Sequence, residues 1–423
     1  MIRKEIFGGI IRMAALVMIM SMLAGACSKN DGPEDNGDNT EQPSKPGEGD
    51  NQGDNGSGDG SGSGSEGGSG DNGEGGGNGS GEGNEGEGGG NEGGQPTDPD
   101  KPQVAATNWM TLLDDNTKVA LLTIPGTHDA ATSTCAGPGK CQTLTISGQL
   151  EHGVRAFDLR PTMDDNSTLG NIYHSILDTD VSMGDAMEYF DSFLKAHPGE
   201  GIIVIMRYES ERQIFGSIAE DNYKTAMKNF LWDNKIYQSR MAAFNKSMTM
   251  KDLRGRILII SRNDLSPVST FETAYTQWSH SNSVGEALYI YGTGGLGRIY
   301  VQDMYSAEKN GNSSEADFLA KKKELVCKLL DITVPFREYE QNNWVINYCS
   351  GYAGSSFASD SYAKNAASTN PAALEHIQAH TGKGFTGIVM MDYAGTDTYE
   401  VGGSTFSVSG KSLTEALIMN NFQ

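Results

Sequence analysis

The sequence predicts an α/β fold, an irregular (β/α)8 barrel of the TIM type that follows a disordered tether. Short apolar runs recur through the later part of the chain, and polar stretches with helical spacing separate them. Continuous apolar runs that alternate with helices are typical of parallel strands buried on both faces. Seven such runs favour a barrel over a doubly wound sheet, and the first is followed by IPGTHD rather than by a GxGxxG dinucleotide fingerprint.

The first 27 residues form an export signal. Three basic residues precede an apolar run, Met13 to Ala24, that is too short for a comfortable membrane span. The window LAGAC ends at Cys27 and resembles a bacterial lipobox, in which the cysteine is lipidated and becomes the mature N-terminus. Leu23 stands one place further from the cysteine than in the usual pattern, so an ordinary secretory signal is the alternative.

Residues 28–104 are predicted to form a flexible linker. They are almost entirely Gly, Asn, Ser, Asp, Glu and Pro, so nothing offsets the entropy of ordering them. The chain's net charge of −23 divides into +2 for residues 1–27, −15 for 28–101 and −10 for 102–423. The folded part is only mildly acidic, and binding to nucleic acid is disfavoured. Acidic residues close behind Cys27 favour a lipid-anchored protein of the bacterial cell envelope, at the outer membrane and facing outward.

The globular part, residues 105–423, is predicted to be one domain of alternating strands and helices. The runs predicted as strands are VALLTI (119–124), VRAFDL (154–159), IIVIM (202–206), ILIIS (257–261), RIYVQ (298–302), WVINY (344–348) and GIVMMD (387–392). Helices are predicted over 182–200, 314–330 and 370–380. Ser182 is expected to cap the first helix, and Pro198-Gly199 to end it.

Four cysteines remain once Cys27 is assigned to lipid. In an oxidising compartment Cys135 and Cys141 could close a small loop and Cys327 could pair with Cys349, although the spacing does not fix the pairing. No CxxC or His/Cys cluster indicates a metal. We therefore expect no metal and no cofactor, and a structural role for any disulfide.

Ionisable residues follow nearly every predicted strand. A barrel gathers its active site at the C-terminal ends of its strands, so these residues are expected to meet. In chain order they are His128 and Asp129, Asp158 and Arg160, Arg207, Arg262, Asp303 and Tyr305, and Asp392. One such residue could be an ordinary loop charge, but matching positions on so many strands indicate a site. His174, in NIYHSI, lies between the second strand and the Ser182 helix and supplies a second imidazole.

Two histidines with carboxylate partners suit phosphodiester chemistry near neutral pH. One accepts a proton from an attacking hydroxyl, and the other donates a proton to the leaving oxygen. The second ring nitrogen of each must be held, and Asp129 and Asp392 could do so. An arginine offers a planar, permanently protonated donor for the charge that builds on the phosphoryl oxygens.

The same residues carry a family resemblance. The sequence resembles the bacterial phosphatidylinositol-specific phospholipases C in IPGTHDA, QLEHGVRAFDLRP (149–161), IYHSI, LRGRILIISR (253–262), YVQDMY (300–305) and GIVMMDY (387–393), in the family's order. Each motif is weak alone, whereas the ordered set is specific. The resemblance implies a barrel enzyme that needs no metal and acts on a membrane phospholipid. Its products would be diacylglycerol and inositol 1,2-cyclic phosphate, with slower hydrolysis of the cyclic product.

The resemblance also implies a role for each catalytic residue. His128 would be the general base on the inositol 2-hydroxyl, with Asp392 orienting it. His174 would be the general acid on the diacylglycerol oxygen, assisted by Asp129. Arg160, with Asp158 beside it, would stabilise the phosphoryl charge. The calcium-dependent branch of the superfamily holds its ion where this chain has Asp158-Leu159-Arg160, so Arg160 would repel the ion and replace its charge.

Four further residues are implied to bind the headgroup. Arg207, Arg262 and Asp303 would bind inositol hydroxyls, and Tyr305 would stack on the ring. Arg207 stands where the family has a lysine, which would alter the headgroup contacts.

Other functions stay open. The same chemistry could act on a glycosylphosphatidylinositol anchor or another inositol phospholipid. Alternatively, the chain could be a catalytically silent surface lipoprotein that binds lipid or glycan, although the complete set of catalytic residues favours an enzyme. The aromatic stretch from Trp278 to Leu296 could meet the membrane interface or pack as an ordinary loop. We expect a monomer.

Three residues outside the predicted site have simpler interpretations. His376 and His380 are four apart on a predicted helix but lack an evident third ligand, so we expect surface residues rather than a metal site. Arg155 is expected to form a structural ion pair.

Overall fold

The computed structural model describes residues 104–423 except 165, 210–219, 267–272, 280, 282 and 308–313. The predicted signal segment, Cys27 and the linker up to residue 103 lie outside the described residues. None of the helices in the described part of the chain combines the length and hydrophobicity needed to span a bilayer.

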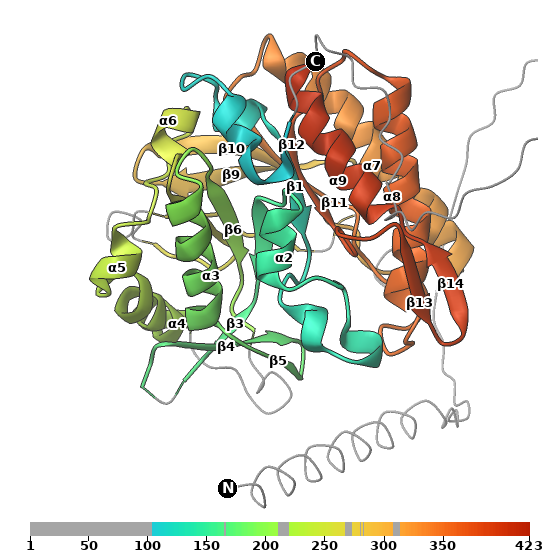
Figure 1. Ribbon diagram of the computed structural model, residues 1–423, viewed down its shortest axis with the longest axis horizontal. Coiled ribbons are helices and arrows are strands. Elements are labelled where there is room, and N and C mark those ends of the chain that lie inside the picture. The colour runs from blue at the N-terminus through green and yellow to red at the C-terminus, as the bar shows by residue number, and fades with distance from the viewer. Residues whose placement is uncertain are drawn as a thin grey trace, which may run out of the picture. The chain divides into compact units, whose positions relative to one another are not determined.

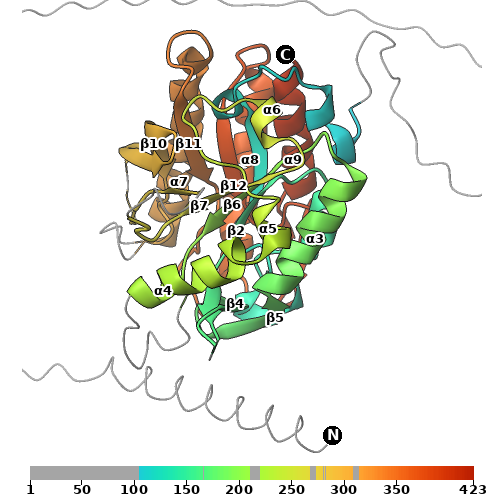
Figure 2. The same ribbon diagram turned by 90° about the vertical axis from the view of Figure 1, so that its left-hand side faces the viewer.

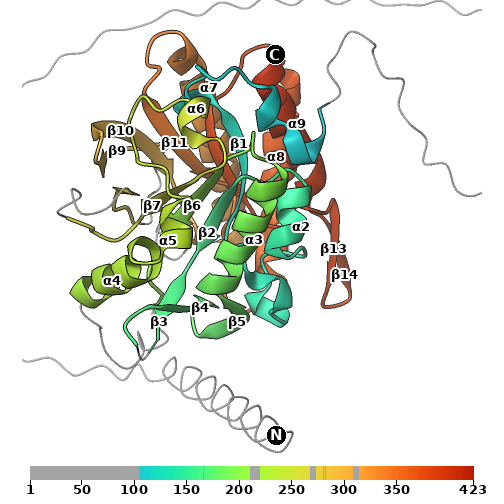
Figure 3. The same ribbon diagram turned by 60° about the vertical axis from the view of Figure 1, so that its left-hand side comes forward.

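Strands from the whole described region close into a barrel, which confirms the predicted fold class. The order around the barrel is β1-β12-β11-β10-β9-β8-β7-β6-β2, and β2 pairs with β1 to close it. The strands are β1 (Thr123–Thr127), β2 (Ala156–Leu159), β6 (Ile202–Met206), β7 (Ile257–Ser261), β8 (Ala274–Tyr275), β9 (Glu286–Gly292), β10 (Gly295–Gln302), β11 (Asn343–Tyr348) and β12 (Gly387–Met391). Figure 3 shows β1, β2, β6 and β7 following one another along the wall.

The barrel has nine strands among the described residues, so the predicted count of eight is wrong. The additional wall segment is β9, which runs antiparallel to both β8 and β10. Its residues alternate between exposed and partly buried positions instead of forming a continuous apolar run. A search for continuous runs detects strands covered on both faces and therefore misses this one.

The first strand differs from its prediction. Val119–Leu121 is a 3-10 turn, and β1 continues past the predicted end at Ile124 through Pro125 and Gly126. Gly126 packs where a Cβ would overlap the Met390 sulfur and lie 3.1 Å from the Ala156 Cβ. The glycine is therefore needed for close packing of β1 between β12 and β2.

Helices cover the outside of the barrel. They are α2 (Ile146–Glu151), α3 (Met183–Ala196), α4 (Glu220–Met227), α5 (Lys235–Gln238), α6 (Met250–Leu253), α7 (Glu315–Thr333), α8 (Ser361–Ala379) and α9 (Gly410–Met419). Figure 1 shows α7, α8 and α9 side by side along one side of the barrel. Ser182 caps α3 through a reciprocal capping box with Asp185, as its position predicts. The helix α8 begins nine residues before the predicted start at Asn370 and accommodates Pro371 in its interior.

Short turns and two small sheets complete the domain. The 3-10 turns are Ala106–Asn108, Met110–Leu112, Val119–Leu121, Thr132–Thr134, Gly137–Gly139, Val334–Arg337 and Asn420–Phe422, and Lys228–Trp232 is a π turn. One sheet consists of β3 (Pro161–Met163), β4 (Leu169–His174) and β5 (Leu177–Ser182), and the other of β13 (Thr398–Val401) and β14 (Ser404–Ser407). Figure 2 shows β4 and β5 at one end of the barrel, where β4 delivers His174.

Alternate residues of each buried strand belong to two different cores. On β6, Ile203 and Ile205 join the cluster inside the barrel, whereas Ile202, Val204 and Met206 join the cluster beneath the helices. Both faces of the strand are thus apolar, which explains the continuous runs in the sequence.

A buried ion pair fixes the N-terminal segment to the barrel. Arg155 and Glu200 are fully buried, and the Arg155 Nε donates to a Glu200 carboxylate oxygen at 2.9 Å. The other Arg155 nitrogens donate to carbonyls that include those of Ala106 and Thr107. The structural role predicted for Arg155 is confirmed.

The predicted disulfides are absent, since the four cysteines among the described residues are free thiols. Cys141 packs in an apolar cluster with Tyr362 and Tyr393. Cys349 lies in the main core, while Cys327 sits on α7 with its sulfur toward the Ala372 carbonyl. Each thiol has separate packing neighbours, which spacing along the sequence does not reveal.

Candidate active site

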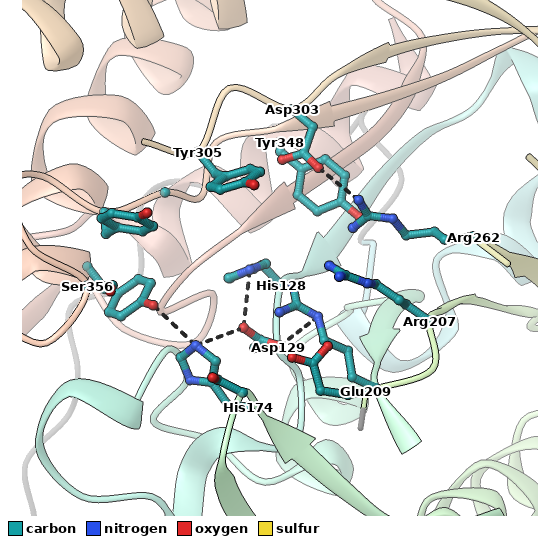
Figure 4. A pocket seen from close by; sticks show the side chains of 15 residues that line it. His128, Asp129, His174, Arg207, Glu209, Arg262, Asp303, Tyr305, Tyr348 and Ser356 are labelled. Carbon is teal, nitrogen blue, oxygen red and sulfur yellow. Dashed lines mark hydrogen bonds and ion pairs between the residues drawn. The ribbon is translucent and has the colours of Figure 1, made fainter. Parts of the chain in front are cut away.

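A pocket opens at the C-terminal ends of the barrel strands, where the sequence predicted a site. Its volume is about 310 Å³, in the range of small-molecule sites. The residues that line it are His128, Asp129, Arg160, His174, Ser175, Arg207, Glu209, Arg262, Asp303, Tyr305, Tyr348, Gly351, Tyr352, Ser356 and Tyr362. Figure 4 shows the two histidines and Asp129 on one side and Asp303 and Arg262 on the other. Of the predicted residues, Asp158 and Asp392 lie directly behind this lining.

A left-handed turn directs two consecutive side chains into the pocket. Neighbouring residues of a strand point to opposite faces. Asp129, two residues after the end of β1, has a φ of 44°, a conformation that aspartate adopts more readily than most residues. The His128 amide still donates to the Met391 carbonyl at 3.1 Å, which continues the pairing with β12. His128 and Asp129 therefore both line the pocket.

The Asp129 carboxylate lies between the guanidinium of Arg160 and the imidazoles of both histidines. One carboxylate oxygen, Oδ1, lies 3.0 Å from the Arg160 Nε. The other, Oδ2, lies 3.2 Å from the His128 Nε2 and 3.4 Å from the His174 Nε2. The Arg160 and His128 charges outweigh the effect of burial and lower the pKa of Asp129 to about 2. Asp129 is thus a permanent anion between two imidazoles and a guanidinium.

His128 is held by a second buried carboxylate. Its Nδ1 lies 2.9 Å from Oδ1 of Asp392, which is fully buried. Burial disfavours the imidazolium, but Asp129 and Asp392 together raise the pKa of His128 to about 9. Burial also raises the pKa of Asp392, and the charge of His128 only partly opposes this. The geometry fixes one tautomer and leaves Nε2 facing the pocket.

His174 is held differently from the prediction. Its Nδ1 donates to the Gly139 carbonyl at 3.0 Å, so a backbone oxygen and not Asp129 fixes the remote nitrogen. Its Nε2 faces Asp129 and also lies 3.2 Å from the Tyr362 hydroxyl. Asp129 consequently acts on the reactive nitrogens of both histidines.

Arg160 follows β2 and is clamped by two carboxylates. Its Nη2 donates to Oδ2 of the fully buried Asp158 at 2.9 Å, while Nε faces Asp129. Burial disfavours the guanidinium charge, but Asp129 and Asp158 outweigh it and raise the pKa of Arg160 well above its ordinary value. The clamp presents a fixed cation to the pocket.

The opposite wall alternates cations and carboxylates. The Arg262 Nη2 lies 3.4 Å from Oδ2 of Asp303, and the guanidinium stacks over Trp278 with its carbon 4.2 Å from the ring centroid. The indole of Trp278 donates to the same Asp303 oxygen at 2.9 Å. Arg207 follows β6, and Tyr305 faces the cavity from the loop after β10. Trp278 therefore supports the pocket wall.

One group of pocket residues also has the composition of a metal site. His128, Asp129 and Cys141 each offer a ligand atom, and these atoms lie within 4.8 Å of one another. Burial raises the pKa of the Cys141 thiol well above its ordinary value, which disfavours the thiolate that binds metals. The Arg160 charge on Asp129 opposes a second cation there. These residues do not fit a resident metal.

Comparison with known proteins identifies the domain. Residues 126–263 match the model of the phosphatidylinositol-specific phospholipase C X domain. The chain is 25% identical over 299 residues to a 1-phosphatidylinositol phosphodiesterase of Staphylococcus aureus, covering 68% of this chain and 88% of that protein. A similarly named protein of Listeria monocytogenes is 35% identical over 173 residues, covering 39% of this chain and 51% of its own.

The structural comparison agrees. A crystal structure of a pentafluoro-Phe-containing phosphatidylinositol-specific phospholipase C from S. aureus superimposes with a TM-score of 0.58 and 26% identity, covering 75% of this chain and 98% of that one. The described domain is therefore similar to bacterial phosphatidylinositol-specific phospholipases C along most of its length. The family resemblance read from the sequence is confirmed.

The matched X domain accounts for only part of the pocket. Seven of the predicted residues fall within it, namely His128, Asp129, Asp158, Arg160, His174, Arg207 and Arg262. Asp303, Tyr305 and Asp392 lie beyond it, and the barrel brings them to the same cavity or directly behind it. All the predicted catalytic and headgroup-binding residues therefore meet, while their individual roles stay predictions.

Sequence reasoning missed several residues of this pocket. Glu209 lines the cavity three residues after β6, and its Oε2 has no hydrogen-bond partner among the described residues. Its place near a strand end was a usable signal. Tyr348 ends β11 beneath His128, with ring centroids 6.2 Å apart, and Tyr362 opens α8. Aromatic residues in apolar runs look like core, so no pattern marks these two.

Proposed function

We propose that this protein is a phospholipase C that cleaves phosphatidylinositol by intramolecular attack of the inositol 2-hydroxyl. The observation that supports this proposal most directly is that two imidazoles and a clamped arginine converge on Asp129. A base, an acid and a cation within one small cavity are what internal transfer of a phosphodiester requires. The names of the relatives support the same lipid as substrate.

The reaction divides the proton transfers between the histidines. The His128 Nε2 accepts the proton of the 2-hydroxyl, whose oxygen attacks phosphorus, and Asp392 stabilises the imidazolium that results. The bond from phosphorus to the diacylglycerol oxygen breaks, and the His174 Nε2 donates the proton that this oxygen needs. Asp129 stabilises the protonated form of His174. The products are diacylglycerol and inositol 1,2-cyclic phosphate.

Arg160 is the cation that stabilises the negative charge on the phosphoryl oxygens. Asp158 and Asp129 hold the guanidinium in place, so little reorganisation is needed when charge develops. We therefore expect full activity in EDTA. A strict requirement for added calcium would contradict this role of Arg160.

The opposite wall suits a polyhydroxylated ring. Arg207 and Arg262 offer donors, and Asp303 and Glu209 offer acceptors for hydroxyl groups. Tyr305 faces the cavity and provides a surface on which the apolar face of the ring can stack. This arrangement favours inositol over the choline of phosphatidylcholine, which has no free hydroxyl and carries a quaternary ammonium group.

One assay tests the proposal. The protein is incubated in EDTA with mixed micelles of phosphatidylinositol or phosphatidylcholine, and the phosphorus products are followed by ³¹P NMR. We expect inositol 1,2-cyclic phosphate from the first lipid and no product from the second. The His128→Ala variant should retain the fold by circular dichroism and lose turnover. Wild-type turnover in this variant would refute the mechanism, and inactivity of the wild type on both lipids would refute the function.

We further propose that the chain is a lipoprotein of the bacterial cell envelope, anchored through Cys27. The basic, apolar and LAGAC segments of residues 1–27 support this. Radiolabelled palmitate should label the wild-type protein in cells and should not label Cys27→Ser. Equal labelling of both would refute the anchor.

A further inference from the structure

Three metal-binding side chains meet where α7 and α8 end. Asp331 lies in the last turn of α7, and His376 and His380 lie at the end of α8. Tyr362, in the first turn of α8, lines the pocket. A helix rises 1.5 Å per residue, so His380 is about 27 Å further along α8. The cluster is therefore at the other end of the barrel from the proposed active site.

The spacing of the ligand atoms fits a small divalent ion. The His376 Nε2 lies 3.1 Å from Oδ1 of Asp331, and the three residues offer ligand atoms that all lie within 4.8 Å of one another. Zinc at about 2.0–2.1 Å from each ligand in a tetrahedral site separates two ligand atoms by roughly 3.3 Å. One edge of such a site is already formed, and the third ligand is within reach of a rotamer adjustment.

The His380 ring is also held as a metal ligand usually is. The His380 Nδ1 donates to the His376 carbonyl at 2.7 Å, which leaves Nε2 as a lone-pair donor with no hydrogen-bond partner among the described residues. Metal-binding histidines usually have their other nitrogen held in this way. The buried Phe385 packs against both rings, whose centroids are 4.3 Å apart. The pair is therefore fixed on one face of the helix.

A surface ion pair explains only part of this arrangement. It accounts for His376 beside Asp331 but not for a second imidazole placed against the first. One divalent ion shared by all three side chains satisfies both rings and the carboxylate.

We propose that Asp331, His376 and His380 form a binding site for Zn²⁺ or a similar divalent transition-metal ion. Water would complete the coordination, since Asp331 is half-exposed and the histidines are only partly buried. The ion would join the ends of α7 and α8 and stabilise the domain. No third ligand for the two histidines was evident in the sequence, because the candidate ligand comes from α7, 45 residues earlier than His376.

The test uses the full chain after treatment with EDTA and removal of the chelator. Zinc is titrated by isothermal calorimetry, and thermal unfolding is followed with and without zinc. We expect one ion per chain at this site and a rise in melting temperature that grows with zinc concentration. In His380→Ala and Asp331→Asn the affinity should fall by at least about tenfold, as loss of metal-site groups typically does.

His152 provides a matched control. It is exposed, and its Nδ1 also contacts the carbonyl four residues earlier, that of Gly148, at 2.9 Å. His152→Ala should therefore bind zinc as the wild type does. Undiminished zinc affinity in both His380→Ala and Asp331→Asn would overturn the proposal, as would absence of zinc binding by the wild type. Binding is read directly, so neither result depends on the phospholipase activity.

Discussion

Replacing Asp392 with asparagine should change the pH dependence and the rate in a distinctive combination. In the wild type, Asp129 and Asp392 overcome burial and raise the pKa of His128 from 6.5 to about 9. A shift of this size corresponds to about 3 kcal/mol in favour of the imidazolium. A general base must be neutral, and at pH 7 only about one His128 in a hundred is. The rising part of the pH profile of kcat/KM, which reports the neutral form of His128, should therefore extend up to a pH of about 9.

The Asp392→Asn variant removes one of the two charges. An opposite charge at this distance typically shifts a pKa by about 1–3 units. The rising limb of the pH profile of kcat/KM should therefore move that far towards lower pH. The catalysed rate should nevertheless fall by about 10²–10⁴-fold, because asparagine cannot stabilise the imidazolium that forms in the transition state. In this variant a larger fraction of His128 would be neutral at pH 7, and the catalysed rate would nevertheless be lower.

The assay is the initial rate of inositol phosphate release between pH 5 and 10. Asp397→Asn is the matched control, since this carboxylate accepts hydrogen bonds from Ser412 and does not line the pocket. It should keep the wild-type profile. Unfolding would lower the Asp392→Asn rate without moving the limb. An unmoved limb with a rate within about twofold of the wild type would refute the pairing of His128 with Asp392.

Three further predictions concern charge and burial. Arg160→Lys should lower kcat by about 10²-fold or more in EDTA, because lysine cannot reach the phosphate while bridging both carboxylates, and unchanged kcat would contradict this. Glu200→Gln should lower the urea-unfolding free energy by about 3 kcal/mol, since Arg155 would remain charged and buried; an effect below about 1 kcal/mol would contradict it. Burial lowers the pKa of Lys322 from 10.5 to about 8. The buried ammonium therefore destabilises the folded state by its full amount below pH 8, and this penalty disappears as the pH rises from 8 to 10.5. Lys322→Met should therefore unfold at higher urea than the wild type at pH 7, and this gain should shrink by pH 10; a constant difference would contradict the titration.

The sequence predicted most parallel strands and the site at their ends, for a physical reason. Strands such as Ile202–Met206 are apolar on both faces, and polar residues directly after them can only face the open end of the barrel. The antiparallel β9 has no such signature. Tyr362 and Tyr348 reach the pocket only through the packing of α8 and β11, which periodicity cannot encode.

Contacts between distant segments were the other limit. Asp331 approaches His376 only because α7 and α8 pack together, and His174 finds the Gly139 carbonyl across a loop. Pairing His128 with Asp392 was predictable only through the family resemblance. The free cysteines show the same limit, since neighbours in sequence such as Cys135 and Cys141 need not bond.

The seam between β1 and β12 makes activity a late event in folding. These strands pair in parallel from Thr123 with Gly387 to Thr127 with Met391, across more than half of the chain. Contacts so distant in sequence form slowly and only after the intervening elements are in place. His128 obtains its carboxylate partner across this seam, so a nascent chain that lacks β12 carries the imidazole without the group that orients it. Regained turnover should therefore mark the completion of refolding, after most helical signal has returned.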